Sequence, residues 1–270
     1  MVIKKIVDFY LNASIHVALA VYALVRITEF YFQLPYNQNL NYFLFFGTIT
    51  GYNFVKYAGV AKLHHKSLTN NLKVIQIFSF FCFLAMCFFG YKIQKETFFY
   101  MLPFVALTIL YAVPFLSGLE KNLRQISYLK IIVVAVVWSA FTVLIPLVES
   151  NRTFNSNLVL ILIQRFLIVI VLILPFDIRD VKYDAISLQT IPKKVGVEKT
   201  KRLGLILLVF SLFIEYLIDV EVNVKNPFML FFFLTVILLM RSKINQPKYY
   251  SSLFVESLPI IWWLFILGFS

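Results

Sequence analysis

The sequence predicts an all-α, polytopic membrane protein, and three observations support this prediction. Hydrophobic residues make up 61% of the 270 residues and charged residues only 14%, whereas soluble domains are about 45–50% apolar and about 25% charged. Apolar runs long enough to cross about 30 Å of hydrocarbon recur along the whole chain. These runs are continuously apolar and do not alternate with polar residues, which excludes a transmembrane β-barrel.

Nine apolar spans can be drawn, each separated from the next by a polar or turn-forming break. No linker long enough to divide the chain appears, so we expect residues 1–270 to form a single transmembrane domain. The N-terminus is basic, but no small-residue cleavage site follows the first span, which we therefore expect to be retained. The spans lie near residues 12–31, 40–59, 74–91, 97–117, 128–148, 157–176, 203–219, 226–241 and 252–269.

The basic residues predict the orientation of the chain in its membrane. A cytoplasmic N-terminus places the loops after the second, fourth, sixth and eighth spans in the cytoplasm too. Of the 25 Lys and Arg residues, 18 fall at the N-terminus or in those loops and five on the other side, while Lys56 and Arg165 are left inside spans. This asymmetry follows the positive-inside rule, so we expect a multi-pass protein of the cytoplasmic (inner) membrane. The net charge of +12 then reflects topology and lipid headgroups, and nucleic acid is not an expected partner.

The densest acidic point of the chain lies at the end of the sixth span. Three of only 13 acidic residues, Asp177, Asp180 and Asp184, fall within eight positions there. At about 100° per residue they share one narrow helix face, from which Arg179 and Lys182 turn away. Clustered carboxylates repel one another unless a cation binds them, and hard oxygen ligands suit Mg²⁺. Pro175 precedes the cluster, so we expect the sixth helix to be interrupted there and a new helical segment to carry the three carboxylates.

These residues resemble the second signature of the UbiA superfamily of intramembrane prenyltransferases. In that family a D-x-x-D-x-x-x-D stretch ends the sixth of nine helices, and a T-x-P-x-x-x-G element follows it. Here Asp177-x-x-Asp180-x-x-x-Asp184 is followed by Thr190-x-Pro192-x-x-x-Gly196. The span count, the orientation and the position of the motif agree as well, so the resemblance covers nearly the whole chain. The family's junction between the fourth and fifth helices is similar to Tyr111-Ala-Val-Pro114, Leu129-Lys130 and Trp138.

The resemblance implies nine helices around a central cavity open to the cytoplasmic side, with residues 177–202 as a cytoplasmic cap loop. A prenyl diphosphate would place its tail in the membrane and its charged head at the interface, where Mg²⁺ and basic side chains neutralise the leaving diphosphate. The implied cofactor is Mg²⁺, and the implied partners are a prenyl diphosphate, membrane lipid and a small acceptor. The implied catalytic and metal-binding residues are Asp177, Asp180 and Asp184, and the implied substrate-binding residues are Asn53, Lys56, Tyr57, Lys121 and Arg124.

The chain departs from the family in the first signature, N-D-x-x-D-x-x-x-D, which belongs at the end of the second span. Asn53 aligns with the leading Asn, but Phe54, Tyr57 and Ala61 occupy the acidic positions. Half of the expected metal site is therefore missing, and Lys56 lies within the segment that should have supplied these acids.

Four groups of basic residues have open interpretations. Lys56 is either a lysine that reaches the interface or pairs with Asp177 or Asp180, or an ammonium that replaces one metal and binds phosphate. Arg165, near the middle of a span, has either a structural polar partner or a functional role. Lys121 and Arg124 are either topology charges or cavity residues. His64 and His65 are either solvated or in contact with phosphate.

Three functions are consistent with this sequence. The first is transfer of an isoprenyl group from a prenyl diphosphate to a small aromatic or hydroxyl acceptor. The second is a divergent accessory protein that binds an isoprenoid or another lipid and has lost transfer, which the degenerate first motif favours. The third is a transporter that uses the intramembrane charges, although no internal repeat of the transporter kind is visible.

Overall fold

The computed structural model describes residues 2–63, 70–112, 129–182, 190–220 and 222–269, and within these ranges the chain is helical without any strand. The fold is thus all-α, as the sequence predicts. In chain order the elements are α1 (Val2–Asn12), α2 (Ile15–Tyr31), α3 (Gln38–Leu63), α4 (Asn70–Gly90), α5 (Lys95–Ala112), α6 (Leu129–Ser139), the π-helical turn η2 (Ala140–Leu144), α7 (Ile145–Glu149), α8 (Ser156–Asp180), α9 (Ile191–Val195), α10 (Val197–Leu217), α11 (Val222–Arg241), the π-helical turn η3 (Tyr250–Val255) and α12 (Leu258–Phe269).

Each predicted span coincides with helix in the described ranges, but nine membrane crossings are not confirmed. Among the residues that the structure describes, five helical segments are long and apolar enough to cross a membrane. A sixth is added if α1 and α2, which meet at 56°, form one span. These segments support an integral, multi-pass membrane protein, while the count of nine remains a prediction. The five segments are Leu72–Gly90, Leu129–Glu149, Ser156–Asp180, Asn223–Arg241 and Tyr250–Phe269.

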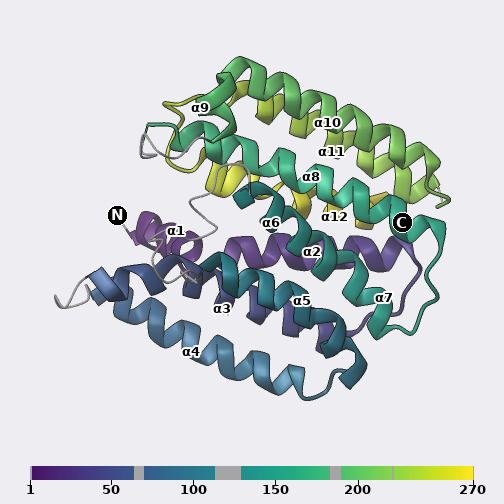
Figure 1. Ribbon diagram of the computed structural model, residues 1–270, viewed down its shortest axis with the longest axis horizontal. Coiled ribbons are helices and arrows are strands. Elements are labelled where there is room, and N and C mark those ends of the chain that lie inside the picture. The colour runs from purple at the N-terminus through teal and green to yellow at the C-terminus, as the bar shows by residue number, and fades with distance from the viewer. Residues whose placement is uncertain (1, 64–69, 113–128, 183–189, 221, 270) are drawn as a thin grey trace.

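The long helices lie side by side with their axes along the longest dimension of the molecule (Figure 1). Helix α3 packs on α4, α8 packs on α6 and α10, and α11 packs on α10 and α12. Helix α2 contacts both α3 and α12, so the N-terminal and C-terminal parts of the chain meet in the middle of the bundle. We call the end that contains the last turn of α8 the Asp177 end, and the end that contains α7 the Glu149 end.

Arg165 of α8 is the centre of the packing between these helices. Its side chain is buried, with 1% of the residue exposed. One guanidinium nitrogen donates to the carbonyl oxygen of Leu24 at 2.9 Å and to Thr142 Oγ1 at 3.3 Å, and the other donates to Thr28 Oγ1 at 3.4 Å. The guanidinium also lies 5.6 Å from the ring of Trp262. A single side chain therefore connects α8 with α2, η2 and α12.

The π-helical turn η2 supplies one of the backbone acceptors in this polar cluster. A π turn interrupts the regular i→i−4 hydrogen-bond pattern of an α-helix. Thr28 Oγ1 donates to the carbonyl oxygen of Thr142 within the turn at 2.7 Å. Backbone polar groups that lose their helical partners must find others, because lipid offers none. These contacts favour the structural interpretation of Arg165 over the functional one.

We expect Arg165→Met to destabilise the protein by about 2–3 kcal/mol, because the methionine keeps the bulk but removes the three buried hydrogen bonds that the guanidinium donates. The measurement is thermal unfolding of the purified protein in detergent. The matched control is Arg152→Met, since Arg152 is exposed in the turn after α7 and its replacement should leave the melting temperature unchanged. A methionine variant at position 165 as stable as the wild type would contradict the assigned role.

Candidate active site

Helix α8 carries the acidic motif to one end of the bundle. The helix begins at an Asn155 cap, whose Oδ1 accepts from the backbone N–H of Leu158 at 3.1 Å. It then continues through Pro175 to Asp180. The expected interruption at Pro175 is thus wrong, since membrane helices accommodate proline when neighbouring groups bond to the freed backbone. Asp177 and Asp180 consequently belong to the last turn of α8 itself.

Asp177 is buried and paired with a lysine that the sequence did not single out as a ligand. Only 1% of Asp177 is exposed, and its Oδ1 accepts from Lys130 Nζ at 2.9 Å. Lys130 lies in the first turn of α6, which packs against α8. A buried carboxylate requires a cation or several donors to offset its lost hydration. The signal available in the sequence was the position of Lys130 at the start of an apolar run, one span before the acidic motif.

Asp180 is paired with its own neighbour in the chain. Arg179 Nε donates to Asp180 Oδ1 at 2.7 Å and Arg179 Nη2 donates to Oδ2 at 3.2 Å. Both side chains are 29% exposed. The expectation that Arg179 turns away from the carboxylates is therefore wrong, because its long side chain folds back along the helix end to reach the adjacent residue.

Asn53 takes part in a structural network. It is 4% exposed; its Oδ1 accepts from Ser14 Oγ at 2.8 Å, and its Nδ2 donates to the carbonyl oxygen of Ala13 at 3.1 Å and to Ser79 Oγ at 2.7 Å. Ser14 has a φ of 61° at the bend between α1 and α2, a backbone conformation that is unfavourable for serine. The Asn53 amide thus holds this bend against α3 and α4.

Lys56 and Tyr57 also contact the connection between α1 and α2. Lys56 Nζ donates to Ser14 Oγ at 2.8 Å, and Tyr57 OH donates to the carbonyl oxygen of Asn12 at 3.0 Å. Lys56 forms no ion pair with Asp177 or Asp180 within the described ranges. The three residues expected from α3 to bind substrate are therefore together at the Asp177 end, and each has a structural contact there.

Helix α1 and the loop before η3 meet at the same end. Lys248 and Tyr249 both donate to the carboxylate of Asp8. The hydrogen bond to Asp8 raises the pKa of Lys248, so the Lys248–Asp8 pair stays charged at neutral pH. The contact keeps α1 against the Asp177 end, although Val2, Ile3 and Ile6 on α1 remain exposed.

Glu256 is an ionisable residue at this end that the sequence reasoning missed. It lies between η3 and α12, is partly exposed, and is within electrostatic range of Lys56 and Arg179. Tyr10 and Tyr52 are also within electrostatic range of Glu256. The available signal was an acidic residue inside a predicted apolar span, 252–269, where ionisable groups are costly and usually functional.

Several predicted site residues lie outside the described ranges: Asp184, Lys121, Arg124, His64 and His65. In the part of the chain that is described, no three His, Cys, Asp or Glu side chains come together to hold a metal. Asp177 and Asp180 instead have Lys130 and Arg179 as cationic partners. The described residues therefore do not fit a metal centre as they stand.

The Thr190-x-Pro192-x-x-x-Gly196 element forms a short helix and its two ends. Thr190 precedes α9, and Pro192 occupies its first turn, where a missing N–H is tolerated. Gly196 has a φ of 88° and separates α9 from α10, a conformation that only glycine adopts readily. The spacing of this element is thus explained by local backbone geometry, next to the end of α8.

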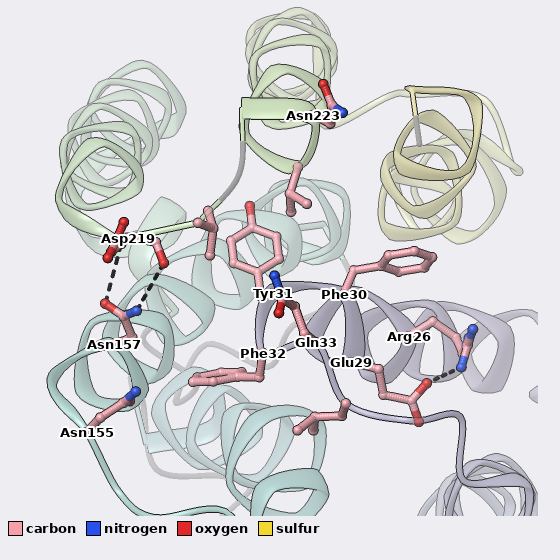
Figure 2. Close-up of a pocket in the computed structure, with 13 residues that line it drawn as sticks. Arg26, Glu29, Phe30, Tyr31, Phe32, Gln33, Asn155, Asn157, Asp219 and Asn223 are labelled. Atoms are coloured by element: carbon pink, nitrogen blue, oxygen red, sulfur yellow. Dashed lines mark hydrogen bonds and ion pairs between the residues drawn. The ribbon is translucent and has the colours of Figure 1, made fainter.

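A pocket of about 770 Å³ opens at the Glu149 end, opposite the acidic motif (Figure 2). Its lining includes the Arg26–Glu29 ion pair and Asn157, whose Nδ2 donates to the carbonyl oxygen of Asp219 at 3.2 Å. The expected opening of a central cavity toward the Asp177 end is not confirmed by this pocket and remains a prediction.

Comparison with solved structures identifies the fold. A UbiA homolog from Archaeoglobus fulgidus bound to DMAPP and Mg²⁺ aligns over 97% of both chains with a TM-score of 0.64 and 14% identity. The same homolog bound to GPP and Mg²⁺ aligns over 97% of this chain and 98% of that one, with a TM-score of 0.61 and 17% identity. The apo UbiA homolog from Aeropyrum pernix K1 aligns over 94% of this chain and 97% of that one, with a TM-score of 0.65 and 10% identity.

No protein-family model and no curated protein matches the sequence. The protein nevertheless has the fold of the UbiA homologs along nearly its whole length. The resemblance expected from Asp177, Asp180, Thr190, Pro192 and Gly196 is therefore confirmed at the level of the fold.

We expect Lys130→Met to destabilise the protein by about 3 kcal/mol, because it removes the cation that is ion-paired with the buried Asp177 carboxylate. Adding Asp177→Asn should restore much of that loss, and the coupling between the two changes is measured by a double-mutant cycle of unfolding. Lys92→Met is the matched control, since Lys92 is exposed in the turn after α4 and its replacement should change stability little. Additive effects of the Lys130 and Asp177 changes would show that the pair is not coupled.

Proposed function

We propose that the protein transfers an isoprenyl group from a prenyl diphosphate to a small aromatic or hydroxyl acceptor within the membrane. The observation that carries this proposal is the full-length likeness to homologs named as bound to DMAPP or GPP. It is supported by the charged groups at the Asp177 end, where Asp177, Lys130, Asp180 and Arg179 lie beside long apolar helices. This combination suits a ligand with a lipid tail and an anionic head.

The proposed reaction breaks the allylic C–O bond of the diphosphate, and the electron pair leaves with the diphosphate. Cations placed where this negative charge develops lower the barrier most. Lys130, Arg179 and Lys56 supply such groups, from α6, α8 and α3. The apolar helices hold the prenyl tail and exclude water from the allylic cation. The acceptor then forms a bond to that carbon and loses a proton.

Mg²⁺ enters this proposal only as an expectation from the family resemblance. A bound Mg²⁺ would neutralise diphosphate oxygens, and the proposed ligands are Asp177, Asp180 and Asp184. Because Lys130 and Arg179 already bind two of these carboxylates, we assign no step to the metal. The remaining proposed substrate-binding residues are Asn53, Lys56, Tyr57, Lys121 and Arg124, with the site on the cytoplasmic side of the inner membrane.

A second candidate function is an accessory protein that binds an isoprenoid or another lipid without transferring it. Phe54 and Tyr57 stand at positions where the family has acids. Asn53, Lys56 and Tyr57 hold the bend between α1 and α2. These contacts favour a segment retained for its structure after its catalytic acids were lost.

We expect the purified protein to bind geranyl diphosphate, and Lys130→Ala or Lys56→Ala to weaken binding about tenfold by removing a charge-assisted hydrogen bond. Isothermal titration calorimetry with and without Mg²⁺ measures the binding of geranyl diphosphate, and a separate assay measures diphosphate release. Lys92→Ala is the matched control, because Lys92 lies at the Glu149 end over the ring of Phe88.

Three results separate the candidate functions. Binding that requires Mg²⁺, fails in Asp180→Ala and leads to diphosphate release supports the transferase. Metal-independent binding without release supports the accessory protein. Wild-type affinity in Lys56→Ala would show that Lys56 does not contact the phosphate.

A further inference from the structure

Glu256 is placed by an irregular turn of the last span. Its backbone N–H donates to the carbonyl oxygen of Ser251 at 3.1 Å, a bond to the fifth preceding residue, as in a π-helix. Such single π turns reorient side chains and occur often at functional sites. The carbonyl oxygen of Leu253 in this turn accepts from His16 Nε2 at 3.0 Å, which fixes η3 against α2. The position of Glu256 is therefore set by contacts from another helix.

The side chain of Glu256 is within electrostatic range of ionisable groups from three other elements. Lys56 and Tyr52 come from α3, Arg179 from α8 and Tyr10 from α1, and all four are within electrostatic range. Lys56 donates its hydrogen bond to Ser14, and Arg179 binds Asp180. Among the described contacts, neither cation forms an ion pair with Glu256. The Glu256 side chain is thus within electrostatic range of two cations and partly exposed, and no ion pair to either cation occupies its oxygens within the described residues.

The neighbouring aspartates are held differently. Asp177 accepts from Lys130, and both oxygens of Asp180 accept from Arg179. At the end of α3, the family's acidic positions hold Phe54 and Tyr57. Lys56 belongs to that same segment of α3. Glu256, far away in the sequence and just before α12, is within electrostatic range of it. It supplies a carboxylate close to where the first acidic motif would have provided one.

We propose that Glu256 is the proton acceptor for the nucleophile in the prenyl transfer proposed above, on which this inference rests. As the C–O bond to diphosphate breaks, a phenol or other hydroxyl acceptor forms a bond to the allylic carbon. The acceptor's proton passes to the Glu256 carboxylate, which becomes a neutral carboxylic acid and returns the proton to water after product release. Lys56 and Arg179 face the departing diphosphate and keep the negative charges of the two groups apart.

The test compares Glu256→Gln with wild type, using geranyl diphosphate as donor and 4-methylphenol as acceptor. We expect the glutamine variant to bind geranyl diphosphate within twofold of wild type while turnover falls about 100-fold, the usual contribution of a general base. Glu256→Ala should recover at least tenfold of its lost turnover when formate is added, because formate replaces the missing carboxylate. The matched control is Glu198→Gln, since Glu198 is an exposed carboxylate at the start of α10 paired with Lys201.

The outcomes distinguish this role from the proposed function. Wild-type turnover in Glu256→Gln, equal losses of binding and turnover, or no rescue of Glu256→Ala by formate would each overturn the role of Glu256 and leave the transferase proposal standing. A wild-type protein that neither binds geranyl diphosphate nor releases diphosphate overturns the transferase proposal itself. Glu256→Asp serves as a folding control, because it keeps the carboxylate and should retain binding with partial turnover.

Discussion

The structure depends on one constraint: polar groups buried in an apolar bundle must find partners inside the protein, because lipid provides none. Arg165 meets this constraint by donating to Leu24, Thr142 and Thr28, and so connects α8 with α2 and the π turn η2. Glu215 follows the same rule, since its carboxylate accepts from Tyr31 OH and Gln164 Nε2, both at 2.7 Å. These interactions fix which helices are neighbours, whereas apolar contacts between helices in a membrane are much less selective.

The same constraint shapes the Asp177 end. Asp177 is buried and therefore requires a cation, which α6 supplies as Lys130. Asn53 and Lys56 stabilise the unfavourable backbone of Ser14, so residues in the degenerate first motif now hold the bend between α1 and α2. The acids of the site are consequently divided between α8 and the turn between η3 and α12. Asp177 and Asp180 are each paired with a basic side chain, and Glu256 is within electrostatic range of two. Such a site is suited to a ligand that brings its own negative charge and a lipid tail.

The sequence placed the acidic motif, and the partners of its residues had to come from the structure for identifiable reasons. The local pattern of Asp177 and Asp180 placed the acidic motif at a helix end, and α8 confirms that position. The partners of these residues were not predictable, because Lys130 is 47 residues away from Asp177 in the chain. Arg179 was predicted to point away from the carboxylates, which is wrong. Helix periodicity locates a Cβ atom but not the end of a long flexible side chain. Glu256 was visible as an acid in an apolar span, but its neighbours were not.

The sequence by itself determined the class of protein and the fold, because long apolar spans and their polar breaks are local properties that lipid imposes on the chain. It also determined the place of the acidic motif at the end of an apolar span, whereas the short helix between Thr190 and Gly196 was found only in the structure. Only the tertiary structure decided that Lys130 neutralises Asp177 and that Glu256 joins Lys56 and Arg179 at one end of the bundle. The physical reason is that pairing of buried charges depends on which helices pack together, and residues far apart in the chain carry no local sign of that contact.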